Sequence, residues 1–140
     1  MKLRAKKAFT LVELMVVILI LAILAALIVP KVTGRASDAK IAKAKSDLSE
    51  IHKVLTTFKL DCDRYPTTQE GLQALISQPA NVKNWKGPYL DGNNINDPWG
   101  NPYVYEYPGS NGQDFNLSSL GSDGAPGGDG DAADIVDGQF

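Results

Sequence analysis

Cysteine and histidine are nearly absent from this sequence of 140 residues, which has one of each, Cys62 and His52. A single cysteine cannot close an intramolecular disulfide, and one cysteine with one histidine cannot form an ordinary zinc cluster. Cysteine catalysis needs a base and an orienting group beside the thiol, and no such signature surrounds Cys62. We therefore predict that the protein is not an enzyme, that Cys62 is structural and that His52 is a partly exposed helix residue.

A basic surface is also missing. The sequence has 14 Lys and Arg residues against 16 Asp and Glu residues, a formal net charge of -2. Four of the cations lie in residues 1–8, so the rest of the chain has 10 cations and 16 acids, a net charge of -6. This distribution excludes the usual basic interface for nucleic acid. It is instead typical of a membrane anchor whose amino end lies in the cytoplasm.

The sequence has one long hydrophobic run, Phe9–Val29, which only Thr10 and Glu13 interrupt. As an α-helix its 21 residues would measure about 31 Å, close to the hydrocarbon thickness of a bilayer. We predict a single transmembrane helix over 9–29. A removed signal peptide with a small-residue site around Ala22–Ala26 is the alternative, but the run is long for one and continues into a helical pattern.

Glu13, inside this segment, and Pro30, directly after it, need an explanation. Glu13 places a carboxylate where desolvation is costly, so it either has a partner or reaches the headgroup region. Pro30 removes one intrahelical hydrogen bond, which predicts a kink or a local loosening of a helix that continues, or else the end of the span.

Residues 30–60 form the amphipathic half of a helix that we predict to run nearly unbroken from Phe9 to Leu60. Apolar residues recur there at spacings of three and four; they are Ile41, Ala44, Leu48, Ile51, Leu55 and Phe58. This apolar stripe needs a partner, which we expect to be the domain formed by residues 61–140.

The sequence of that domain predicts a small α+β unit. The capping-box spacing from Thr67 to Glu70 predicts a short helix over Gln69–Ser77, and Asp97–Gly100 has the residues of a type I turn. Alternating residues at 103–107 and 115–118, separated by turn residues, predict an antiparallel hairpin with room for a third strand. The predicted fold class is α+β: a long N-terminal helix, transmembrane and then amphipathic, packed on a small antiparallel β-sheet.

The chain ends in an Asp/Gly-rich loop, residues 120–138. Five aspartates lie between Gly121 and Gly138, and no Lys or Arg occurs from Gly121 to Phe140. Such acids either stay solvated in a disordered tail or close around a cation such as Ca²⁺, which takes about 6–8 oxygen ligands. The residues alone leave both possibilities open, although their spacing excludes an EF-hand and an RTX repeat.

Several segments of the chain resemble those of a known family. The segment KKAFTLVE, residues 6–13, resembles the cleavage region of type IV pilins and pseudopilins. The runs YPTTQEGLQAL, WKGPYL, DPWGNPYVYEYPG and SLGSDG resemble the major pseudopilins of type II secretion systems over nearly the whole chain. The resemblance implies that a prepilin peptidase removes a leader peptide, residues 1–8, by cutting between Ala8 and Phe9. The same enzyme would then N-methylate Phe9. The family prefers glycine where this chain has Ala8.

The resemblance also implies two roles for acidic residues. Glu13 would pair with the new amino group of Phe9, in its own chain or in an adjacent subunit, and offset part of its desolvation cost. Structural calcium would be bound by Asp123, Asp134 and the Leu120 carbonyl. The family often has a second acid where this chain has Ala133, so we expect Asp131 to supply the missing oxygens, and we leave out Asp129 and Asp137.

The function that the resemblance implies is that of the major structural subunit of a periplasmic pseudopilus, a filament that drives export of folded proteins through the outer membrane. The implied partners are further copies of the chain in a helical homopolymer, minor pseudopilins, an inner-membrane assembly platform and the prepilin peptidase. The implied location is the bacterial inner membrane, crossed once, with the C-terminal domain in the periplasm. The alternatives are a type IV pilin-like surface fibre subunit and a monomeric membrane-anchored calcium-binding protein.

Overall fold

The computed structural model describes residues 9–110 and 112–140. The chain divides after Ala36 into two compact units, residues 1–36 and 37–140. The helix α1, Leu11–Cys62, contributes residues to both units. The prediction of one helix from Phe9 to Leu60 is thus confirmed to within two residues at each end. The helix does not end at Pro30, although the side chains of residues 28–33 lie outside the description.

The predicted leader, residues 1–8, lies outside the described residues, and with it the Ala8 side of the expected cleavage site. In the part of the chain that the structure describes, none of the helices has the length and apolar character that crossing a membrane requires. The predicted span, Phe9–Val29, ends in two residues whose side chains are not described. The transmembrane assignment therefore remains a prediction.

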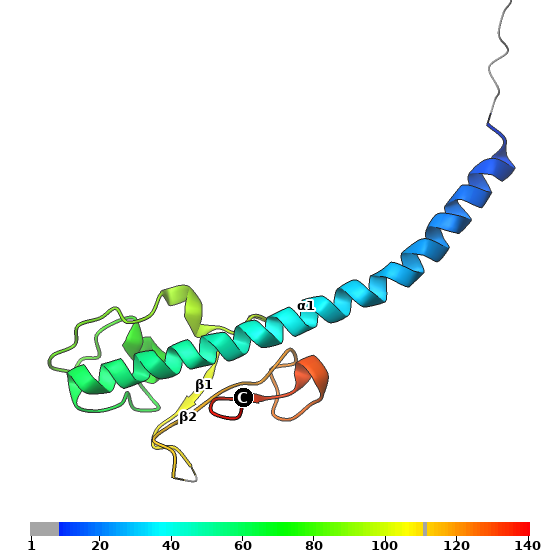
Figure 1. Ribbon diagram of the computed structural model, residues 1–140. Coiled ribbons are helices and arrows are strands. Elements are labelled where there is room, and N and C mark those ends of the chain that lie inside the picture. Colours follow the sequence, from blue (N-terminus) through cyan, green and yellow to red (C-terminus); the bar gives the residue numbers. More distant parts are fainter. Residues whose placement is uncertain (1–8, 111) are drawn as a thin grey trace, which may run out of the picture. The chain divides into compact units, whose positions relative to one another are not determined.

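The second unit contains a three-stranded antiparallel sheet beside the C-terminal half of α1 (Figure 1). Its strands are β1, Val104–Glu106, β2, Asn116–Ser119, and β3, Ile135–Val136, in the order β1-β2-β3. Tyr105 pairs with Leu117, and Ser119 pairs with Ile135. The predicted hairpin is confirmed, and the third strand lies inside the segment that we expected to be a loop.

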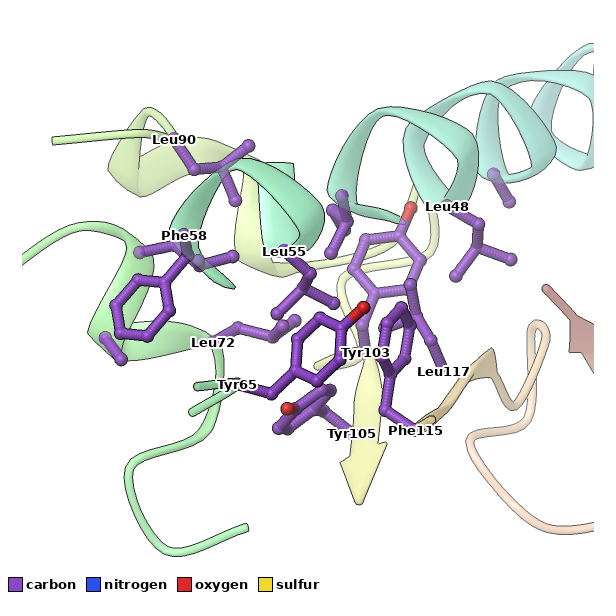
Figure 2. Packing of buried hydrophobic residues seen from close by; sticks show 14 of the residues in the cluster. Leu48, Leu55, Phe58, Tyr65, Leu72, Leu90, Tyr103, Tyr105, Phe115 and Leu117 are labelled. Atoms are coloured by element: carbon purple, nitrogen blue, oxygen red, sulfur yellow. The ribbon is translucent and has the colours of Figure 1, made fainter. Parts of the chain in front are cut away.

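The core of the second unit forms between α1 and this sheet. Figure 2 shows apolar side chains of α1 packed with aromatic and aliphatic residues of the strands and of the segments that precede them. Leu48, Leu55 and Phe58 are 0% exposed, whereas Tyr107, directly after β1, is 36% exposed. Burial of a large apolar side chain contributes roughly 1.5–3 kcal/mol, so the stripe on α1 is a main source of the stability of this unit. Its predicted partner is confirmed.

The predicted helix over Gln69–Ser77 is wrong in length and type. The structure has a 3₁₀ helix, η1, at Gly71–Leu75. Gly71 has a φ of +56°, a left-handed conformation that an α-helix cannot pass through. The predicted capping pair is present, since the Thr67 backbone N–H donates to Glu70 Oε2 at 2.8 Å and the Glu70 N–H donates to Thr67 Oγ1 at 3.2 Å.

Two further 3₁₀ helices, η2 at Gly92–Ile95 and η3 at Gly130–Ala132, lie in the connections. The predicted turn at Asp97–Gly100 is confirmed, because the Gly100 N–H donates to the Asp97 carbonyl at 2.9 Å. This turn precedes β1, and its Asp97 side chain accepts a hydrogen bond from Ser119 at the end of β2.

Candidate functional site: helix start and acidic loop

The first candidate site is the start of α1. The Thr10 backbone N–H and hydroxyl donate to Glu13 Oε2 at 3.0 and 3.1 Å, and the Glu13 N–H donates to Thr10 Oγ1 at 3.2 Å. This is a reciprocal capping box. Glu13 therefore has a partner within its own chain that we did not expect from the sequence, although the Thr-x-x-Glu spacing was present to indicate it. The neighbouring Phe9 is 82% exposed.

The following turns of α1 expose apolar side chains on every face. Consecutive residues from Leu14 to Leu21 are all at least 47% exposed in the first unit. A helix that is apolar all round is stable only when lipid or other protein surrounds it. Residues 11–27 therefore present a continuous apolar surface that is exposed in the first unit.

The second candidate site is the acidic loop. Asp123, Asp131 and Asp134 are all exposed. Asp123 Oδ1 accepts the Ala125 N–H at 3.1 Å, and Asp134 Oδ2 accepts the Gly127 N–H at 2.9 Å. In residues 9–110 and 112–140, no three or more His, Cys, Asp or Glu side chains gather closely enough to hold a metal ion. Asp123 and Asp134 thus have defined hydrogen-bond partners, but the predicted ligands do not form one cluster.

The backbone nevertheless closes this loop. The Ser122 N–H donates to the Asp131 carbonyl at 2.8 Å. Gly121 has a φ of +68°, and a Cβ there would lie 2.8 Å from the same carbonyl. Only glycine tolerates both conditions. The closure places Leu120 and Asp123 on one side of the junction and Asp131 and Asp134 on the other, and all four offer the oxygen ligands that Ca²⁺ prefers.

A buried polar network lies at the base of the loop. Asp97 is 5% exposed and Ser119 is 0% exposed. Asp97 Oδ1 accepts the N–H groups of Trp99 and Asn101 at 3.1 and 2.8 Å, and Asp97 Oδ2 accepts the Ser119 hydroxyl at 2.6 Å. From the sequence we assigned Asp97 only to a turn and gave Ser119 no role.

The last residues of the chain contact α1. His52 Nδ1 lies 2.5 Å from Asp137 Oδ2, within hydrogen-bond distance, and the Asp137 N–H donates to the Leu117 carbonyl at 2.9 Å. The Lys45 ammonium lies 5.5 Å from the centre of the Phe140 ring, within cation–π range. Asp137, which we left out of the predicted ligand set, thus has another partner. The His52 side chain is 52% exposed, as predicted.

Cys62 lies at the end of α1 and is half-buried. Burial raises the pKa of its thiol, which keeps the thiol protonated and a poor nucleophile near neutral pH. His52 lies ten residues earlier on the same helix, about 15 Å along its axis. The helix therefore separates the two residues that a cysteine–histidine pair would need.

Comparison with known families matches two parts of the chain. Residues 31–138 match the family model described as type II secretion system protein G. Residues 3–29 match the prokaryotic N-terminal methylation motif.

Individual relatives agree with these matches. The type II secretion system core protein G of Pseudomonas aeruginosa is 49% identical over 139 residues, covering 96% of each chain. That of Vibrio cholerae is 42% identical, covering 96% of this chain and 92% of its own. The crystal structure of the major pseudopilin from the type 2 secretion system of enterohaemorrhagic Escherichia coli is 34% identical, with a TM-score of 0.62. The match covers 74% of this chain and 87% of that one.

Proposed function

The chain belongs to the type II secretion system protein G family and is a major pseudopilin; from this premise we propose how its residues serve assembly and export. The proposed role is that of the repeating subunit of a periplasmic filament that drives folded proteins through the outer membrane. The observation that carries this proposal is the exposed apolar surface of residues 11–27. The buried core of the second unit consists of other residues.

We propose that Phe9–Val29 is held in the inner membrane before assembly and that the second unit lies in the periplasm. The match of residues 3–29 to the N-terminal methylation motif supports cleavage between Ala8 and Phe9 by a prepilin peptidase, followed by N-methylation of Phe9. In the assembled filament the same apolar surface would contact the helices of other copies. Minor pseudopilins and an inner-membrane assembly platform are the proposed further partners.

Glu13 has a specific part in this proposal. Its carboxylate lies at the Thr10 N–H, one residue from the amino group that cleavage would create on Phe9. An ammonium group there, in the same chain or in the next subunit, would give the carboxylate an opposite charge in a poorly solvated position. The capping box holds the carboxylate at the end of the helix before that pairing occurs.

We also propose that the acidic loop binds calcium through Asp123, Asp131, Asp134 and the Leu120 carbonyl. The support is the chemistry of these oxygens and the glycine-dependent closure at Gly121. Calcium would supply positive charge that offsets the repulsion among the carboxylates and would fix the loop. Such a bound ion stabilises a small domain that lacks a disulfide.

The test of assembly uses three variants at the helix start. Glu13→Gln keeps an oxygen that accepts the Thr10 N–H but removes the charge, whereas Thr10→Ala removes the hydroxyl of the capping box and keeps the charge. Glu50→Gln, an exposed acid on α1 of the second unit, is the matched control. Filament yield is measured by chemical cross-linking in the native membrane.

We expect Glu13→Gln to reduce the cross-linked ladder at least tenfold, because the proposed charge pairing is lost. Thr10→Ala should reduce it less, and Glu50→Gln should leave it unchanged. A normal ladder from Glu13→Gln would refute the charge-pairing role, and a wild-type chain that yields only monomers would refute assembly.

A further inference from the structure

A buried carboxylate at the base of the acidic loop has no role in the function proposed above. Asp97 is 5% exposed, and three neutral donors hold it: the N–H groups of Trp99 and Asn101 and the hydroxyl of Ser119. Burial of a carboxylate is costly unless its oxygens are hydrogen-bonded. These bonds offset that cost, and they fix the orientation of both oxygens.

The network continues from Asp97 to Gly121 along two paths. Ser119 Oγ, which donates to Asp97, accepts the Gly121 N–H at 3.2 Å. Asn101, whose N–H donates to Asp97, donates through its side-chain amide to the Gly121 carbonyl at 2.8 Å. Both backbone polar groups of Gly121 are therefore held by residues that Asp97 itself holds.

Gly121 is the residue at which the acidic loop closes. Its left-handed φ and its close approach to the Asp131 carbonyl leave no space for a side chain. The next residue, Ser122, donates its N–H to that carbonyl. Displacement of Gly121 would therefore break the backbone closure that joins the segment of Leu120 and Asp123 to the segment of Asp131 and Asp134.

We propose that Asp97, acting through Ser119 and Asn101, is a positioning residue that holds Gly121 so that the two halves of the acidic loop are ready for Ca²⁺. This inference rests on the calcium site proposed above and adds residues that contribute no ligand to it. The network orders the backbone before the ion arrives, which lowers the entropy cost of binding. Binding of the ion then costs only the conformational entropy of the exposed carboxylate side chains.

The experiment measures calcium affinity by isothermal titration of the full chain in a mild non-ionic detergent. Ser119→Ala breaks the path to the Gly121 N–H and leaves the Asp97 turn in place. Asn101→Ala breaks the path to the Gly121 carbonyl and keeps the backbone N–H that donates to Asp97. Both avoid removal of Asp97 itself, which would leave buried donors unpaired.

Tyr105→Phe is the matched control. It removes one buried hydrogen bond, from the Tyr105 hydroxyl to the Pro66 carbonyl at 2.8 Å. Neither of these two residues belongs to the acidic loop. It should lower the calcium-free melting temperature about as much as Asn101→Ala does, since each variant removes one side-chain hydrogen bond to a backbone carbonyl. Comparison of the two separates a general loss of stability from a specific loss of calcium binding.

We expect Asn101→Ala, which removes one hydrogen bond to Gly121, to raise the calcium Kd about tenfold, and Ser119→Ala, which removes two hydrogen bonds, to raise it at least as much. Tyr105→Phe should leave the Kd within about twofold of wild type, on the same scale. Unchanged affinity in both loop variants would overturn the positioning role and leave the calcium site standing. A wild-type chain that binds no calcium would overturn the calcium site itself, and with it this inference.

Discussion

The ion pair between Arg64 and Glu70 gives the sharpest prediction about stability. Arg64 Nη1 and Nη2 donate to the two oxygens of Glu70, each at 2.7 Å, and Glu70 also accepts the Thr67 N–H. Hydrogen bonds from the Arg64 guanidinium and, to a smaller extent, from Thr67 lower the pKa of the Glu70 carboxyl from 4.5 to about 2. Each pKa unit corresponds to about 1.4 kcal/mol, so a fully protected pair would contribute about 3 kcal/mol.

Solvent reduces this contribution. The Arg64 and Glu70 side chains are 33% and 23% exposed, so we expect about 1–2 kcal/mol. Because the pKa of Glu70 is lower in the folded chain, the contribution is complete above pH 4.5 and is lost as the pH falls towards 2. Glu70→Gln keeps an oxygen for the Thr67 N–H and removes only the charge.

The assay is urea unfolding of the full chain in detergent, followed by the fluorescence of Trp85 and Trp99. At pH 7, the unfolding free energy of Glu70→Gln should be about 1–2 kcal/mol lower than that of wild type. The difference should shrink steadily between pH 4.5 and pH 2. Glu50→Gln serves as the control at each pH. A difference between Glu70→Gln and wild type that stays constant down to pH 2 would refute the reasoning.

Three further predictions follow from the second unit. Leu55→Ala removes a side chain that is 0% exposed and should lower the unfolding free energy by about 2–5 kcal/mol in the same urea assay; a loss below about 1 kcal/mol would contradict the described core. Gly121→Ala should destabilise the chain by about 1–3 kcal/mol more than Gly127→Ala, since both have positive φ but only Gly121 meets backbone within 4 Å; equal melting temperatures would count against loop closure. Removal of calcium with EGTA should lower the melting temperature of wild type, and no change would argue against the calcium site.

The long helix, its apolar stripe and the hairpin could be predicted because each depends on a local pattern. The spacing of Leu48, Ile51 and Leu55 fixes one face of a helix, and the alternation around Tyr105 fixes one face of a strand. The capping pair of Thr67 and Glu70 was predictable for the same reason, since both partners lie within one turn.

The contacts that could not be predicted from the sequence join residues far apart in the chain. Asp97 and Ser119 are separated by 22 positions, and His52 and Asp137 by 85. Nothing in the local pattern of either pair indicates its partner. The error at residues 69–77 has a different cause, because one glycine in a left-handed conformation outweighed a capping signal that was itself correct.

Protein export in the bacterium that encodes this chain tests the proposed function most directly. The gene is deleted, and a protein normally secreted in folded form is measured in the medium and in the periplasm. We expect this protein to accumulate in the periplasm, and the wild-type chain, but not Glu13→Gln, to return it to the medium. Unchanged secretion in the deletion strain would contradict the central claim that the chain is the subunit of an export-driving filament.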